Sequence, residues 1–305
     1  YTATGTTLTR TVSESSNADA AIVLTGSATV FIGATAADIP ALYAESYDGT
    51  SGLPVATGST NAVAIGRAYA DGTDSFAAAI ANNTSSYGAT GDESVAMGRF
   101  AKATGSRSIA LGGNATATAL FATALTNSYA SGGDSFAAGM DSASASYGAQ
   151  ATSSIAIGKQ AKATGAYGTA IGEATQATAS NSVCMGYYSQ ATAQGAVAIG
   201  YDAQATAGKS YSFGLKVRNA IQNTFRFAGG HFSAAGDAQS GIYIMRSDTT
   251  DATAEALTTT KTAASTDNQV ILPNNSAYFF SGTIIARQQA SAGTDVGAWE
   301  IKGAI

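Results

Sequence analysis

Five triplets return every fourteen residues in the middle of the chain: Ala156-Ile157-Gly158, Ala170-Ile171-Gly172, Cys184-Met185-Gly186, Ala198-Ile199-Gly200 and Ser212-Phe213-Gly214. Each consists of a small residue, a large apolar residue and glycine. A short fixed period with a turn residue at a fixed phase is typical of a solenoid, in which each coil buries its apolar face only by stacking on the next. Counting earlier copies, the predicted structural glycines of the repeat are Gly66, Gly98, Gly112, Gly158, Gly172, Gly186, Gly200 and Gly214.

A longer period of sixty residues is superimposed on the first. Residues 61–120 align without gaps on residues 121–180, and Asp74-Ser75-Phe76-Ala77-Ala78 recurs as Asp134-Ser135-Phe136-Ala137-Ala138. In both copies nineteen residues, not fourteen, separate the Phe-Ala-Ala element from the next triplet. We therefore expect a matched bulge or loop of about five extra residues in each copy, near its Ser-Tyr-Gly-Ala element.

Three segments follow from these patterns. Residues 1–58 form an N-terminal β segment, with strand-like residues 7–12 and 28–32, a turn at 15–17 and an exit loop at 48–54. Residues 59–215 form the repeat region. In residues 221–305 the period stops and bulkier strands appear, separated by turn residues 273–275, which predicts a compact antiparallel β domain. Residues 250–257 are compatible with a short helix or a loop.

Composition excludes two kinds of partner. Charged residues make up 11% of the 305 residues and the net charge is -5, with no basic cluster, so nucleic acid is a poor partner. No stretch approaches the roughly eighteen apolar residues of a membrane helix, and the start of the chain does not resemble a signal peptide.

The chain opens at Tyr1 without Met, as a fragment or processed product would. A single cysteine excludes an intrachain disulfide.

The repeat also predicts self-association. A strand through residues 154–158 places Ile155 and Ile157 on one face and Ala156 on the other. The isoleucine face then fills space, and the alanine face allows a neighbouring segment to approach closely. Burial of apolar surface stabilises a fold by about 25 cal/mol for each Å². Because alanine is so abundant, a single thin coil buries little apolar area, and we expect several copies to associate and bury more.

The pattern Ser-x-Ala-Ile-Gly-x-x-Ala-x-Ala-x-Gly resembles the head repeats of trimeric autotransporter adhesins. The resemblance is best at residues 94–105, 108–119, 154–165 and 169–179, and covers about half the chain. It implies an all-β fold: a left-handed parallel β-roll that assembles as a homotrimer, flanked here by small β segments.

The flanking residues resemble segments of tailed-phage tail and fibre proteins. These are Gly5 to Val12, followed by 14–17 and 28–31, and the ending from Ile271 through Trp299 to Ile305. An autotransporter is expected to end in a membrane anchor preceded by a heptad stalk, and the 305 residues show neither. Residues 217–220 only faintly echo the adhesin neck. The resemblance implies a virion fibre or spike of a bacteriophage that contacts other tail proteins and attaches to a host receptor. A bacterial surface adhesin and a polysaccharide-degrading tailspike remain as alternatives.

No residue pattern predicts catalysis, a cofactor or a metal. His231 is the only histidine and has no nucleophile motif beside it, so we expect a structural or exposed side chain. No carboxylate pair suited to glycan cleavage stands out. Asp74 and Asp134 follow Gly-rich turns, for which an Asx hydrogen bond is favoured over calcium. Lys102 and Lys162 are expected to be solvated. Cys184 takes the small position of a triplet and is expected to be buried.

Aromatic side chains are the candidate binding residues, because they supply stacking area for sugars and hot spots for proteins. The candidates are Tyr87, Tyr147, Tyr187, Tyr188 and Trp299. Tyr167 and Tyr201 also lie in the repeat, where covering strand edges is an alternative role. In the C-terminal segment Tyr278, Phe279, Phe280 and Trp299 are favoured as core residues. The expected ligand is a glycan or protein receptor on a host cell.

Overall fold

The computed structural model describes residues 2–4, 7–9, 55–56, 60–66, 68–78, 86–140, 144–251, 253–272, 276–288 and 295–305. All regular elements in these ranges are β-strands, which confirms the all-β prediction, and residues 250–257 contain no helix where they are described. The chain divides into two units, residues 1–44 and 45–305, and each is described by itself.

Two kinds of strand alternate along the second unit. The longer strands are β4 (Val63–Ile65), β6 (Phe76–Ala78), β8 (Val95–Met97), β10 (Ile109–Leu111), β12 (Thr123–Leu125), β14 (Phe136–Ala138), β16 (Ile155–Ile157), β18 (Thr169–Glu173), β20 (Val183–Tyr187), β22 (Val197–Tyr201), β24 (Tyr211–Leu215) and β26 (Thr224–Ala228). The shorter strands are β3 (Val55–Ala56), β5 (Tyr69–Ala70), β7 (Gly88–Ala89), β9 (Lys102–Ala103), β11 (Thr116–Ala117), β13 (Tyr129–Ala130), β15 (Gly148–Ala149), β17 (Lys162–Ala163), β19 (Gln176–Ala177), β21 (Gln190–Ala191), β23 (Gln204–Ala205) and β25 (Arg218–Asn219).

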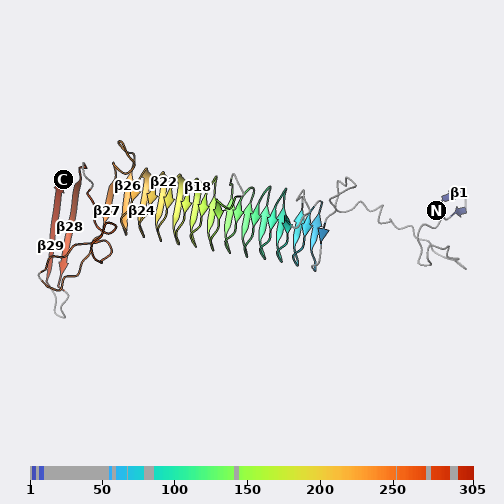
Figure 1. The fold of residues 1–305 in the computed structure, drawn as a ribbon, viewed down its shortest axis with the longest axis horizontal. Coiled ribbons are helices and arrows are strands. Elements are labelled where there is room, and N and C mark those ends of the chain that lie inside the picture. Colours follow the sequence, from blue (N-terminus) through green and yellow to red (C-terminus); the bar gives the residue numbers. More distant parts are fainter. Residues whose placement is uncertain are drawn as a thin grey trace. The chain divides into compact units, whose positions relative to one another are not determined.

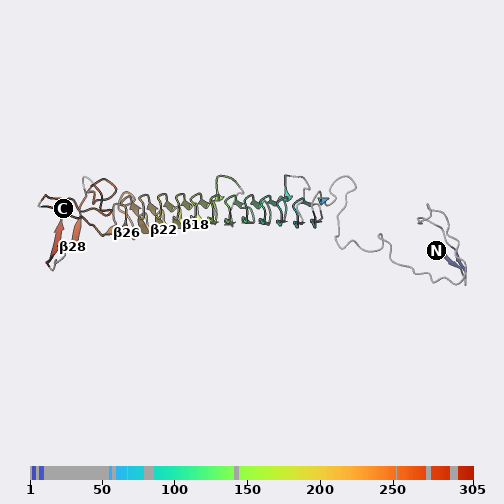
Figure 2. The ribbon, with the colours of Figure 1, turned by 90° about the horizontal axis from the view of Figure 1, so that it is seen from below.

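These strands form a parallel β-solenoid, as predicted from the fourteen-residue period. The longer strands pair in parallel with one another in one sheet, and the shorter strands pair in parallel in a second sheet (Figures 1 and 2). The register follows the sequence period, since Ala156 pairs with Ala170 and Ala163 pairs with Ala177. The parallel pairing continues to Ala228, one turn beyond residue 215.

The sixty-residue duplication gives two copies of the same local structure. Ala70 pairs with Ala89 in the first copy, and Ala130 pairs with Ala149 in the second. In each copy the extra residues lie between a longer strand and the next shorter strand, β6 to β7 and β14 to β15. The strand register is therefore kept across the additional residues.

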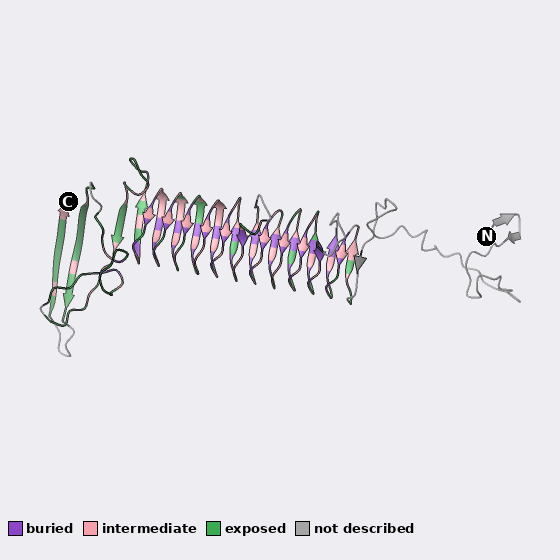
Figure 3. Ribbon diagram, in the orientation of Figure 1, coloured by how far each residue is buried: buried purple, intermediate pink, exposed green. Residues whose placement is uncertain are grey.

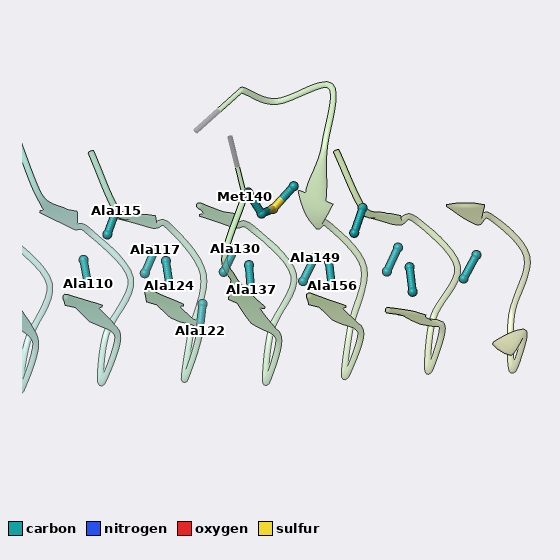
Figure 4. Packing of buried hydrophobic residues seen from close by; sticks show 14 of the residues in the cluster. Ala110, Ala115, Ala117, Ala122, Ala124, Ala130, Ala137, Met140, Ala149 and Ala156 are labelled. Carbon is teal, nitrogen blue, oxygen red and sulfur yellow. The ribbon is translucent and has the colours of Figure 1, made fainter. Parts of the chain in front are cut away.

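The apolar interior of the solenoid is made almost entirely of alanine. The central alanines of the longer strands meet those of the shorter strands between the two sheets, and nearly all are fully buried (Figures 3 and 4). Cys184 takes such a central position and is fully buried, as predicted. The core between the two sheets is therefore thin and is filled mainly by alanine methyl groups.

The larger apolar side chains of the triplets point out of the coil. In β16, Ala156 is fully buried while Ile155 is 37% exposed. The period-two alternation fixes this arrangement, because the narrow interior accepts only the alanine face. The face with the larger side chains is thus the outer surface of the longer strands. The sequence alone did not determine which of the two faces lies outside.

The triplet glycines share a positive φ, which favours glycine. All eight have positive φ, from +67° at Gly66 to +141° at Gly200. At Gly186, where φ is +115°, a Cβ atom would lie 2.1 Å from the carbonyl oxygen of Gly200 in the next coil. Glycine is therefore required both for the left-handed turn and for the close approach of successive coils.

Polar side chains replace alanine inside the last coils. Ser212 donates a hydrogen bond to the carbonyl of Gln204 at 2.8 Å, and Asn219 donates to the carbonyls of Tyr211 and Thr224 at 3.1 and 3.0 Å. Arg226 donates to the carbonyl of Arg218 at 2.8 Å. β27 (Ser240–Tyr243) then pairs antiparallel with β26, which ends the parallel stacking.

The remaining strands form two separate antiparallel pairs. β28 (Phe279–Arg287) pairs with β29 (Val296–Ala304), and neither contacts any other strand that the structure describes. The antiparallel strands expected in 221–305 are thus present, but these two form no common sheet with β27. In the first unit β1 (Thr2–Thr4) pairs with β2 (Thr7–Thr9). The features predicted at 15–17, 28–32, 48–54 and 273–275, and the boundary at 58, lie outside the described residues.

Candidate functional site

An apolar surface runs over the outer face of the longer strands. We call it the outer ladder; it consists of the two outward-facing residues on either side of the buried residue in each strand. Its first row is Val63, Phe76, Val95, Ile109, Thr123, Phe136, Ile155, Thr169, Val183, Val197, Tyr211 and Phe225. Its second row is Ile65, Ala78, Met97, Leu111, Leu125, Ala138, Ile157, Ile171, Met185, Ile199, Phe213 and Phe227. Only Ala78 among them is buried.

The strand register aligns the outer ladder from rung to rung. Val95 pairs with Ile109 and Met97 with Leu111, so apolar side chains stack on apolar side chains about 4.8 Å apart. The last rungs are aromatic: the rings of Tyr211 and Phe225 stack with centroids 4.4 Å apart. Apart from Thr123 and Thr169 both rows are apolar or aromatic, so the ladder forms one continuous apolar surface.

Three tyrosines gather where the longer strands end. We call Tyr187, Tyr188 and Tyr201 the tyrosine cluster. Tyr187 and Tyr201 are register partners in β20 and β22, and their rings stack with centroids 4.9 Å apart. The ring of Tyr188 meets that of Tyr187 edge to face at 4.4 Å. Tyr188 is 47% exposed and Tyr201 49% exposed, so the cluster offers ring faces to solvent.

The local sequence builds this cluster. Each tyrosine of the strand follows a triplet glycine, Gly186 or Gly200, whose positive φ turns the chain at the corner of the coil. Tyr188 itself has a φ of +54° in that turn. One coil earlier, Glu173 is the register partner of Tyr187 and forms an ion pair with Lys159 at 3.6 Å. Charged and aromatic groups therefore lie side by side.

The surroundings further favour the protonated form of the Tyr187 hydroxyl. Partial removal from water raises the pKa of Tyr187 above its ordinary value, and the nearby Tyr188 and Glu173 raise it further. At neutral pH the hydroxyl is thus a neutral donor and acceptor beside a carboxylate. Stacked rings with hydroxyl, carboxylate and ammonium groups at their rim can hold a polar ring such as a sugar.

The other predicted binding residues lie apart from this cluster. The ring of Tyr87 meets Phe100 at 5.1 Å, and the Arg99 guanidinium lies 4.5 Å from the centre of the Phe100 ring. Tyr147 is half-buried and packs against the alanine core. Trp299 is in β29. Of the five candidates the structure brings together only Tyr187 and Tyr188.

Sequence reasoning did not assign three groups that the structure places at or near the cluster. From the sequence, Tyr201 is a repeat tyrosine for which covering a strand edge is an alternative role, and no pattern singles out Glu173 or Lys159. The available signal was the period itself, because residues 173, 187 and 201 are spaced by fourteen and must lie on successive rungs. The residues of the outer ladder likewise follow from the period, but which face of the longer strands points outward depends on the width of the core.

His231 and Asp74 take ordinary structural positions. His231 is exposed, with its Nε2 atom 3.2 Å from the Nζ atom of Lys216. Asp74 accepts a hydrogen bond from the Asn61 side chain at 2.7 Å and has a φ of +55°, which suits an acidic turn residue. Among the described residues no three His, Cys, Asp or Glu side chains converge as metal ligands. None of the described segments forms a helix able to cross a membrane.

Comparison with known families identifies the repeat. A family model described as YadA head domain repeat (2 copies) matches residues 89–115, 103–125, 149–173, 163–189, 177–203 and 191–210. These overlapping matches cover about a third of the chain and coincide with the coils from β8 to β12 and from β16 to β23. No curated protein matches the chain. The solenoid of this protein therefore contains YadA head repeats, the β-roll repeats of trimeric autotransporter adhesins.

Proposed function

We propose that the chain forms a homotrimeric attachment fibre in which three copies bury their outer ladders against one another. The outer ladder carries this proposal. A single copy would leave a continuous apolar surface along the solenoid, and large exposed apolar surfaces mark interaction sites. Repeats of the YadA type usually form homotrimers, which supports three copies as the assembly.

The packing inside each coil explains why association is needed. The interior buries mainly alanine, whereas the side chains that would contribute about 1.5–3 kcal/mol each on full burial, such as valine, leucine, isoleucine and phenylalanine, lie outside. Their burial between copies would add the apolar area that the thin coil lacks. The fold and the assembly are then stabilised by the same residues.

We further propose that this fibre belongs to the tail of a bacteriophage virion and contacts other tail proteins. The support is the resemblance of residues 5–31 and 271–305 to segments of phage tail and fibre proteins. The head region of a bacterial trimeric surface adhesin is the second candidate, and the match of the YadA head repeat fits it at least as well.

The tyrosine cluster is the proposed contact site for a host-cell glycan or protein receptor. Its exposed stacked rings and adjoining Lys159 and Glu173 support recognition, and we propose binding without cleavage. Purified protein should bind host cells, and Tyr201→Ser should weaken binding about tenfold, as for the loss of one aromatic hot spot. Tyr167→Ser, which alters a tyrosine that is 61% exposed in an earlier coil, is the matched control.

Two further measurements separate the candidate functions. If Tyr201→Ser and Tyr167→Ser bind host cells as well as the unaltered protein, the cluster is not the contact site. An antibody against residues 86–140 should label the tails of intact virions; label confined to the surface of bacteria would instead support the adhesin. Release of reducing sugar ends from host polysaccharide would contradict binding without cleavage and favour a tailspike.

A further inference from the structure

The β28–β29 hairpin has one entirely apolar face. Nine register pairs join the strands, from Phe279 with Ala304 to Arg287 with Val296. Alternation along both strands places one set of eight residues on a single side, which we call the Trp299 face. Its members are Phe280, Gly282, Ile284, Ala286, Gly297, Trp299, Ile301 and Gly303. The opposite face is mixed: it carries Phe279, Ile285 and Val296 among polar and charged residues, which are Ser281, Thr283, Arg287, Glu300 and Lys302.

The Trp299 face is low and smooth. A Cβ atom on Gly297 would lie 2.4 Å from the Trp299 ring, and one on Gly303 would lie 2.5 Å from the Phe280 ring. Both rings therefore lie over glycine backbone along the hairpin instead of standing away from it. A flat apolar sheet surface of this kind is suited to packing face to face on another sheet, about 10 Å away.

Nothing in the described part of one chain covers this face. Trp299 is 55% exposed, Phe280 and Ile301 are each 41% exposed, and the two strands contact no other described strand. An isolated two-stranded hairpin is marginally stable in water at best, and further strands on an apolar face are what make it stable. We therefore expect further strands to pack on the Trp299 face of this hairpin.

We propose that this partner is the same hairpin from other copies of the chain, so that β28–β29 forms a second self-association site distinct from the outer ladder. The inference rests on the proposed homotrimer, in which equivalent hairpins are held at a high effective concentration. The Trp299 face has no polar side chain to match a polar partner, and its own flat apolar surface is a suitable complement. Arg287, Glu300 and Lys302 on the opposite face remain in solvent.

Trp299 is the only tryptophan of the 305 residues, so its fluorescence reports on this face alone. In the full chain, collisional quenching of Trp299 by acrylamide is expected to be several-fold weaker than in the urea-unfolded chain. Ile284→Lys places an ammonium group on the Trp299 face and is expected to restore quenching, because burying an unpaired charge is strongly unfavourable. Ile285→Lys is the matched control: it alters the neighbouring isoleucine, which is 71% exposed on the opposite face.

Native mass, measured on the same samples, separates this inference from the proposed assembly. A trimer with shielded Trp299 that only Ile284→Lys exposes supports the second site. A trimer in which Trp299 is as accessible as in the unfolded chain overturns the inference and leaves the homotrimer standing. Shielding in a monomer, or equal effects of the two lysine variants, also overturns it. A monomer with accessible Trp299 contradicts the homotrimer itself.

Discussion

Backbone conformation at single residues determines how tightly this coil can turn. Left-handed φ recurs at the corners of successive coils, at residues such as Asn181, Lys209 and Asn223, where β-branched side chains are almost never found. Other corners are formed by the triplet glycines, which also lie against the backbone of the next coil. The sequence tolerates many side chains at the first kind of corner and only glycine at the second.

Gly186→Ala tests the second kind of corner. The added methyl group meets the Gly200 carbonyl oxygen, and φ is +115°, so we expect the free energy of unfolding to fall by about 2–5 kcal/mol. Gly208→Ala is the control, because φ there is not positive and the nearest atom is 3.8 Å from the new Cβ. Urea titration of both variants measures the difference; equal stabilities would contradict the proposed role of the triplet glycine.

Cys184 gives a residue-level prediction that depends on pH. Burial raises the pKa of the Cys184 thiol from 9.0 to about 12. Above pH 9 the unfolded chain therefore loses a proton that the folded chain keeps, so stability is fully present below that pH and is lost as the pH rises toward 12. Cys184→Ala matches the alanines at the neighbouring rungs and removes this effect.

The measurement is the unfolding free energy of wild type minus that of Cys184→Ala under reducing conditions. Above about pH 9 this difference should fall, with a limiting slope of about 1.4 kcal/mol per pH unit. A difference that does not change with pH would mean that the thiol is not buried in the folded chain.

At the level of the strand and its turn, a buried serine fixes the entry to many of the longer strands. The Ser182 hydroxyl donates a hydrogen bond to the carbonyl of Ala179 at 2.6 Å, and Ser154 does the same to Ala151 at 2.7 Å. The equivalent Ser108 is also fully buried, but its hydroxyl has no hydrogen-bond partner in the structure. Identical motif positions therefore contribute differently.

Ser182→Ala is expected to lower the free energy of unfolding by about 1 kcal/mol, because a buried hydrogen bond is lost. Ser108→Ala is expected to leave stability unchanged or raised, since it removes a buried hydroxyl that makes no bond. Thermal unfolding of the two single variants, with the double variant to check additivity, measures both effects. The reverse order of stabilities would contradict the hydrogen-bond assignment.

The positions and register of the strands could be predicted from the sequence, whereas the face that lies inside could not. The period located the strands and their register because coils of equal length must place residue 156 beside 170 and residue 163 beside 177. It did not say which face of Ile155-Ala156-Ile157 lies inside, since that depends on how closely the two sheets approach. The tyrosine cluster was missed as a unit for a related reason: Tyr188 joins it through the corner geometry, and Tyr201 joins it as the register partner of Tyr187 in the next coil.

At the scale of the molecule, over the coils that the structure describes, the distribution of apolar residues is inverted relative to an ordinary solenoid. Alanine occupies the interior, and valine, isoleucine, methionine and phenylalanine line the outer ladder. The described hairpin also exposes apolar side chains, on its Trp299 face. Both surfaces make sense if copies of the chain cover them, and neither suits a protein that works as a monomer.

The native mass of the purified chain tests this account most directly. One chain has a mass of 30.2 kDa, and sedimentation equilibrium should give three times this value. Ile199→Lys on the outer ladder should abolish the trimer, whereas Gln190→Lys on the shorter-strand sheet should preserve it, because only the first places a charge between apolar surfaces. A folded wild-type chain that sediments as a monomer would contradict the account.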